Sequence, residues 1–278
     1  MTLKLTKYEF RSTVRMMGVL WIALPILAVL IGLNDKFFGG NGLEELPAAV
    51  NLMNSVITFL YFAIFVALIT MTVMIIILRF YRGLLRDEGY LMHTLPVKTW
   101  QLITAKGVVA VCVSIISMAV GVLSILLLSL FEGWNSVHVG EFLQYAMELM
   151  KERPMIAVIA LECMVLVIAW LMAGIYKVYA SLSIGQLATK HKIALSAVSY
   201  VGISIAGIMI LSLAGKVFNT LTGWFDGLAD SVEAWISGIS TDGTIVLSLL
   251  IVILFEIVKV AVFHVVSQQL LRRKLNLE

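Results

Sequence analysis

Six apolar stretches, each long enough to cross a lipid bilayer as a helix, constrain this chain more than any other feature of its sequence. A helix needs about 20 mainly apolar residues to cross the hydrocarbon core of a bilayer. Each stretch is apolar on all sides, which is typical of helices surrounded by lipid or by other spanning helices. The stretches are Met16–Leu33, Asn54–Leu78, Lys106–Phe131, Met155–Tyr176, Ile193–Ala214 and Thr244–Leu270.

The composition agrees with this pattern. The chain has 278 residues, of which 61% are hydrophobic and 13% charged, and its mean hydropathy is +1.01. Soluble domains are nearer half apolar and a quarter charged, so a cytosolic enzyme and a disordered regulator are excluded. Backbone inside lipid must satisfy its own hydrogen bonds, and the alternating pattern of a membrane barrel is absent. We therefore expect an all-α polytopic membrane protein, with residues 1–278 forming a single transmembrane domain.

The distribution of charge predicts the orientation. Most of the 20 Lys and Arg residues fall on one side of the predicted spans, and most of the 17 acidic residues fall on the other. By the positive-inside rule, both termini should be cytoplasmic in a cell-membrane protein. The first stretch has no small-residue cleavage pattern after it, so we expect it to be retained as a span. The basic residues of the cytoplasmic side are Lys4, Lys7, Arg11, Arg15, Arg79, Arg82, Arg86, Lys98, Lys106, Lys177, Lys190, Lys192, Arg272, Arg273 and Lys274.

Residues 1–15 are predicted to form an amphipathic helix. Lys4, Lys7, Arg11 and Arg15 share one narrow arc, beside an arc of apolar residues. Such a helix lies at a membrane interface with its basic stripe facing anionic lipid headgroups. The alternative is a charged flank that only sets the topology.

The second cytoplasmic segment, residues 79–105, is the most informative loop. Arg79, Arg82 and Arg86 are spaced along one helical face that continues out of the second span. Gly89 is suited to a helix end, and Pro96 to the first position of a new helix. A short element with both charged and apolar residues suits docking to a cytoplasmic partner. The alternative is a solvated linker.

The outer loops also have helical patterns. The sequence from Glu141 to Arg153 predicts an amphipathic helix that Pro154 ends. Residues 215–243 predict a helical hairpin between the fifth and sixth spans, with Gly223 and Gly227 dividing it. Its apolar seam consists of Phe218, Leu221, Phe225, Leu228, Val232, Trp235 and Ile239.

No motif for soluble-type catalysis is present. The sequence has no Walker loop, dinucleotide fingerprint, HExxH or GxSxG. The four histidines lack metal-ligand spacing, and Cys112 and Cys163 lie inside apolar stretches, so no catalytic residue, metal site or disulfide framework is expected. We expect a protein that is not an enzyme and has no nucleic-acid partner.

Three ionisable residues inside the predicted spans are candidate sites. Charged groups in spans cost about 2.5–3.5 kcal/mol each on insertion scales, so they suggest function. Glu162 lies about two turns into the fourth span, and Glu256 and Lys259 are i, i+3 in the sixth. One interpretation is a substrate path or a proton-coupling site. The other is a structural pair, Glu256–Lys259, packed between helices.

The second cytoplasmic segment resembles the permease subunits of the ABC-2 type exporter family, in the branch common in Gram-positive bacteria. The resemblance rests on the run RGLLRDEGYLMHTLPV from Arg82 to Val97, followed by Gln101-Leu102 and Ala105-Lys106. The remainder is architectural: a cytoplasmic N-terminal helix, six spans and an outer hairpin before the last span.

The resemblance implies a half-transporter that exports an unidentified substrate, such as a peptide, a drug or a lipid-like molecule. Two permease subunits would form a homodimer or heterodimer, and each would rest on a separate ATP-binding subunit that holds ATP and Mg. This chain itself would bind no cofactor. The segment 79–105 would couple the two subunits. The residues implied in coupling are Arg82, Arg86, Asp87, Glu88, Leu91 and Pro96.

Two other functions remain open. One is a membrane scaffold or assembly factor that does not transport but uses the same docking segment. The other is a secondary transporter driven by an ion gradient, which predicts internal repeats and broken helices near the midplane. The sequence shows little of either, because Pro25 is the single proline inside a predicted span.

Overall fold

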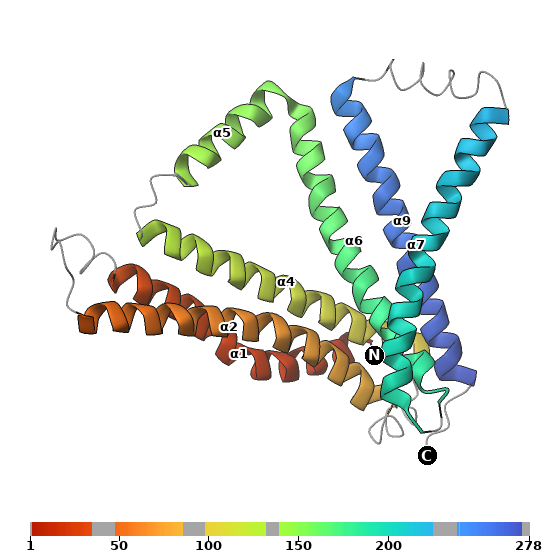
Figure 1. Cartoon of the computed structure of the whole chain (residues 1–278), viewed down its shortest axis with the longest axis horizontal. Helices are drawn as coiled ribbons and strands as arrows, with labels where there is room; N and C mark the ends of the chain where they lie inside the picture. Colours follow the sequence, from red (N-terminus) through yellow and green to blue (C-terminus); the bar gives the residue numbers. More distant parts are fainter. Residues whose placement is uncertain are drawn as a thin grey trace. The chain divides into compact units, whose positions relative to one another are not determined.

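The computed structural model describes residues 2–34, 48–85, 98–131, 139–188, 190–224, 238 and 240–273, and these residues form helices and short connections without any strand (Figure 1). The all-α prediction is confirmed for this part of the chain. Its α-helices are α1 (Thr2–Asn34), α2 (Ala48–Phe80), α4 (Thr99–Phe131), α5 (Val139–Glu152), α6 (Pro154–Gly185), α7 (Lys192–Trp224) and α9 (Thr241–Arg273). A π-helical turn, η2 (Tyr81–Leu85), continues α2.

Six of these helices, all except α5, are long and apolar enough to cross a membrane. Each has 32 or 33 residues. At a rise of about 1.5 Å per residue such a helix is about 50 Å long, whereas the hydrocarbon core is about 30 Å thick. Large apolar side chains remain exposed on them, for example Phe59 (73%), Trp170 (65%) and Ile208 (70%). The chain is therefore a multi-pass membrane protein whose helices extend beyond the apolar stretches.

Two predicted boundaries differ from the structure. The predicted interfacial helix 1–15 and the first span are one continuous helix, α1, although Pro25 lies within it. Residues 215–224 are the last turns of α7 and not the start of a separate hairpin helix. No proline interrupts the backbone hydrogen bonds of α7, so the helix continues past the end of the apolar stretch. Residues 225–237 of the predicted hairpin lie outside the described residues.

The helix predicted before the fourth span is present. It is α5, which ends at Glu152, and Pro154, which was predicted to end it, is the first residue of α6. Proline fits the first turn of a helix because the N–H groups there have no intrahelical acceptor. Gln144, Tyr145 and Glu148 on α5 are exposed.

Two compact units make up the chain, and we describe each by itself. Unit 1 consists of residues 1–80 and 104–146, and unit 2 of residues 81–103 and 147–278. In unit 1, the helices α1, α2 and α4 share one apolar core. The core residues are Met17, Leu24, Leu68, Ile75, Val109 and Val113.

Polar side chains also join the three helices of unit 1. The indole Nε1 of Trp21 donates to Ser117 Oγ at 3.0 Å, and Thr72 Oγ1 lies 3.0 Å from the same oxygen. Tyr61 and Ser124 form a further hydrogen bond between α2 and α4, at 3.0 Å. Hydrogen bonds between helices are favourable inside a bilayer because water offers no competing partner there.

In unit 2, α6 packs against both α7 and α9. The ring of Tyr176 on α6 contacts His264 on α9, with ring centroids 5.4 Å apart. A tight turn joins α6 to α7. A Cβ atom on Gly185 would lie 1.8 Å from Ser196 Oγ and 2.6 Å from the carbonyl oxygen of Lys192, so this approach of two helix ends requires glycine.

Candidate functional sites

Among the residues of unit 1 that the structure describes, the carboxylate of Glu9 forms two salt bridges to other helices. Its Oε2 accepts a hydrogen bond from Arg79 Nη1 at 2.8 Å, and its Oε1 accepts one from Lys106 Nζ at 2.7 Å. Arg79 also donates from Nη2 to Ser12 Oγ at 2.6 Å. One carboxylate on α1 therefore joins the end of α2 to the beginning of α4. We call Glu9, Arg79 and Lys106 the ionic cluster.

Two members of the ionic cluster, Glu9 and Lys106, are buried, and Arg79 is partly exposed. Glu9 is 9% exposed and Lys106 is 6% exposed. Buried charges are tolerated when they are paired and hydrogen-bonded, and both oxygens of Glu9 meet this condition. The backbone carbonyl oxygen of Glu9 also accepts a hydrogen bond, from the Thr13 hydroxyl at 2.8 Å.

Glu9 was not among the candidate residues predicted from the sequence. Arg79 was predicted to lie on the helical face that leaves the second span, and Lys106 to end the resembling segment, but neither was predicted to pair with Glu9. A signal for Glu9 was present, since it is the single acidic residue among the first 34, within a basic segment. Its partners could not be read from the pattern, because they lie 70 and 97 residues away in the chain.

The predicted coupling segment, residues 79–105, begins and ends at this cluster. After Arg79 the chain makes the π-helical turn η2, in which Arg82 is exposed while Gly83 and Leu84 are buried. The other residues implied in coupling, Arg86, Asp87, Glu88, Leu91 and Pro96, lie outside the described residues. The chain resumes at residue 98 with the start of α4, where the Gln101 N–H donates to the carbonyl oxygen of Lys98 at 2.9 Å.

The predicted pair in the last span is confirmed. Lys259 Nζ donates to Glu256 Oε1 at 2.6 Å, one turn apart on α9. Glu256 is 7% exposed, and its second oxygen, Oε2, is buried without a hydrogen-bond partner. Lys259 also lies over the ring of Phe255, 5.1 Å from its centroid. Lys259 thus neutralises the charge of Glu256, but the Oε2 atom of Glu256 has no hydrogen-bond partner among the described residues.

Lys177 lies within α6 and not in a loop after the fourth span. The apolar stretch stops at Tyr176, but the helix continues to Gly185, because a helix ends where its hydrogen bonding ends and not where hydropathy falls. Lys177 Nζ donates to the hydroxyl of Ser204 on α7. It also lies over the ring of Tyr200, 4.2 Å from the centroid. Both partners are uncharged.

Glu162 lies on the buried side of α6. It is 8% exposed, and its Oε2 atom is buried without a hydrogen-bond partner. The structure therefore places Glu162 inside the protein and not on its lipid-facing surface, which fits a role in recognition or packing equally well.

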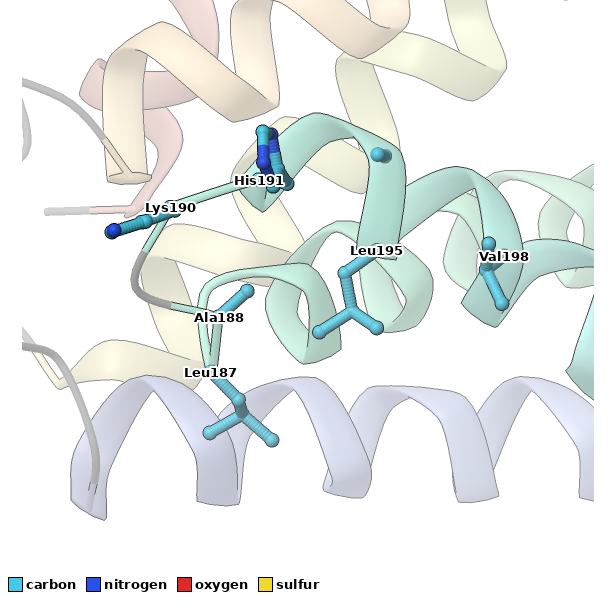
Figure 2. Close-up of a pocket in the computed structure, with 7 residues that line it drawn as sticks. Leu187, Ala188, Lys190, His191, Leu195 and Val198 are labelled. Atoms are coloured by element: carbon cyan, nitrogen blue, oxygen red, sulfur yellow. The ribbon is translucent and has the colours of Figure 1, made fainter.

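An open hollow of about 520 Å³ lies beside the turn between α6 and α7. Figure 2 shows Leu187, Leu195 and Val198 around it, with Lys190 and His191 at its rim. The hollow has an apolar floor and a basic edge, and most of its residues are exposed. Among the residues that the structure describes, no three His, Cys, Asp or Glu side chains are grouped so as to hold a metal ion.

Comparisons with known proteins do not assign the chain to a family. No family model, no curated protein and no solved structure matches the chain.

Proposed function

We propose that this chain is the membrane-spanning permease subunit of an ATP-driven exporter. Six long apolar helices supply a spanning domain. The segment between α2 and α4 resembles the coupling segment of ABC-2 type permeases. ATP and Mg are bound by a separate subunit, and a second permease subunit completes the transporter.

The observation that carries this proposal is the position of the ionic cluster. Arg79 immediately precedes the body of the coupling segment and Lys106 immediately follows it, and Glu9 binds both. The two ends of the segment are therefore fixed to each other and to α1. A displacement of the segment by a docked subunit is transmitted to three helices of unit 1 together.

This arrangement suits energy coupling for a physical reason. A ligand shifts a conformational equilibrium only through its different affinities for the two states. In this proposal nucleotide binds to the docked ATP-binding subunit. The coupling segment must therefore transmit the conformational change of that subunit to the spanning helices. Packed elements that move together can do so, and the ionic cluster joins the base of the segment to three helices.

The docking contact is assigned to Asp87 and Glu88, whose carboxylates would pair with basic residues of the ATP-binding subunit. The test is purification of the tagged chain from its native membrane, followed by mass spectrometry. We expect a stoichiometric Walker-type ATPase that is lost from the Asp87→Lys/Glu88→Lys variant. The Glu148→Lys/Glu152→Lys variant, which makes the same charge change on the exposed face of α5, should retain it. Absence of any ATPase from the wild-type complex would contradict the proposal.

One observation favours a second candidate, a transporter driven by an ion gradient. Glu162 and Glu256 are both buried in unit 2 with an unpaired carboxylate oxygen. Carboxylates of this kind mark proton or cation paths in many transporters. Transport that persists without ATP, and stops in Glu162→Gln or Glu256→Gln, would favour this candidate over the exporter. Assembly with a partner but no transport of any kind would favour the scaffold.

A further inference from the structure

Lys177 is an ammonium group in a spanning helix without a counter-ion. Within the part of the chain that the structure describes, no carboxylate forms a salt bridge with it, and its partners are the Ser204 hydroxyl and the Tyr200 ring. A hydroxyl and a ring stabilise an ammonium group, but neither neutralises its charge.

A second ammonium group, that of Lys259, lies on the helix that packs against α6: the ring of Tyr176, next to Lys177, contacts His264 of α9, five residues after Lys259. Lys259 is neutralised by Glu256, with which it forms a 2.6 Å salt bridge. The three charged groups therefore carry one excess positive charge where α6, α7 and α9 meet. An uncompensated positive charge among apolar helices is unfavourable. A bound anion would therefore stabilise the packing of α6 with α7 and α9.

The depth of this place suits a lipid headgroup. At a rise of about 1.5 Å per residue, Lys177 lies about 35 Å from the start of α6, and Lys259 about 27 Å from the start of α9. The hydrocarbon core is about 30 Å thick, so Lys177, the first residue after the fourth apolar stretch, lies near one of its boundaries. Lys259 lies inside the sixth stretch, and its long side chain can extend its ammonium group toward the same boundary. The charge distribution predicts that this boundary is the cytoplasmic one.

The place is also accessible from the membrane. The side chain of Lys259 is 34% exposed. Tyr200 and Phe255, the rings beneath the two ammonium groups, are each 41% exposed. The two ammonium groups can bind an anionic headgroup, with the rings of Tyr200 and Phe255 beside it. The exposed apolar surfaces of the helices can contact the acyl chains of the same lipid.

We propose that Lys177 and Lys259 form a binding site for the phosphate headgroup of an anionic phospholipid of the cytoplasmic leaflet. The phosphate oxygens accept hydrogen bonds from both ammonium groups, and the acyl chains lie along the exposed apolar surface of the helices. Basic pockets between spanning helices on the cytoplasmic side bind anionic lipids in this manner. The site requires only that the chain spans a membrane with this boundary on the cytoplasmic side, so it is independent of the exporter proposal.

The test is native mass spectrometry of the full-length chain, purified in detergent and offered equal amounts of phosphatidylglycerol and phosphatidylcholine. We expect the wild type to retain phosphatidylglycerol preferentially. Each lysine near a membrane surface contributes enough to change binding about fivefold, so Lys177→Gln should reduce the preference by about that factor. Lys177→Gln/Lys259→Gln should abolish it, and Lys177→Arg should preserve it.

The matched control is Lys216→Gln, which removes the same charge from an exposed position near the other end of α7. It should bind phosphatidylglycerol like the wild type. Equal preference in Lys177→Gln and wild type, with both proteins monodisperse, would overturn the proposal. So would thermal stabilisation by inorganic phosphate alone without any preference for phosphatidylglycerol, since the site would then bind a soluble anion and not a lipid.

Discussion

Glu9 on α1 forms salt bridges to two other helices, α2 through Arg79 and α4 through Lys106. Its carboxylate is shared between a buried lysine and a partly exposed arginine, so the three residues do not contribute equally to stability. Loss of Glu9 breaks both salt bridges, to Arg79 and to Lys106. Loss of Lys106 breaks one of them and leaves the Glu9–Arg79 salt bridge in place.

This asymmetry gives the first prediction. Glu9→Gln should lower the free energy of unfolding by about 3 kcal/mol, the lower end of the range for breaking a buried pair, because Arg79 is 23% exposed. Lys106→Gln should lower it by less. Thermal unfolding of both variants in the same detergent measures the difference, and an equal loss would show that the Glu9–Arg79 salt bridge adds nothing to stability. Glu148→Gln, at an exposed position of α5, serves as the control.

A second prediction at this scale concerns Ser117, which connects α4 to both α1 and α2. Ser117→Ala removes the acceptor of the Trp21 indole N–H and the partner of Thr72, so stability should fall by about 1 kcal/mol. Ser129→Ala, also on α4, removes only a bond to the carbonyl oxygen of Leu126 in its own helix and should have little effect. Similar unfolding temperatures for the two variants would argue against a contribution of the interhelical bonds.

At the scale of elements, the connection between α6 and α7 should be the least tolerant of substitution. Gly185→Ala places a methyl group against Ser196 and the backbone of Lys192, so the expected loss is about 1–3 kcal/mol. Gly174→Ala, in the same helix with no atom within 4 Å of the added Cβ, should be neutral or slightly stabilising, because alanine favours helix. The two variants are compared by thermal unfolding in detergent. An unimpaired Gly185→Ala protein would mean that the two helix ends separate at no cost.

The helices themselves could be predicted from sequence because lipid imposes a simple requirement, about 20 apolar residues with internally satisfied hydrogen bonds. Some of their ends could be predicted as well: α4 ends at Phe131, and α7 starts at Lys192, one residue before the predicted stretch. Other ends could not, because Lys177 and Lys216 mark places where hydropathy falls and yet lie inside helices. Beyond the apolar stretch the backbone can continue as helix in water or at the interface, and hydropathy does not report where it stops.

Among the site residues, pairs that are close in sequence could be predicted, whereas pairs between different helices could not. Glu256 and Lys259 are one turn apart, so their pairing was visible in the sequence and is confirmed. The partners of Glu9 and Lys177 come from other helices, and a spacing rule cannot find them. The coupling residues from Arg86 to Pro96 were inferred from a resemblance, and their role stays a prediction.

For the whole molecule, the orientation in the membrane can be tested directly. With Cys112 and Cys163 replaced by alanine, a single cysteine is introduced either at Glu148 on α5 or at Lys190 in the turn after α6; both positions are exposed. A membrane-impermeant maleimide should label the Glu148→Cys protein in intact cells. It should label Lys190→Cys only after permeabilisation. The reverse pattern would place both termini outside and remove the basis for a cytoplasmic docking segment.

The ion pairs of Glu9 bring the two ends of residues 80–105 to one point, which closes this part of the chain into a loop. Loop closure lowers conformational entropy, and this loss rises only slowly with loop length, so most of it is incurred once the ends meet. Here it is incurred when unit 1 folds. A partner that binds the segment therefore meets a stretch of chain whose two ends are already held together. A smaller loss of entropy on association gives a tighter complex from the same set of contacts.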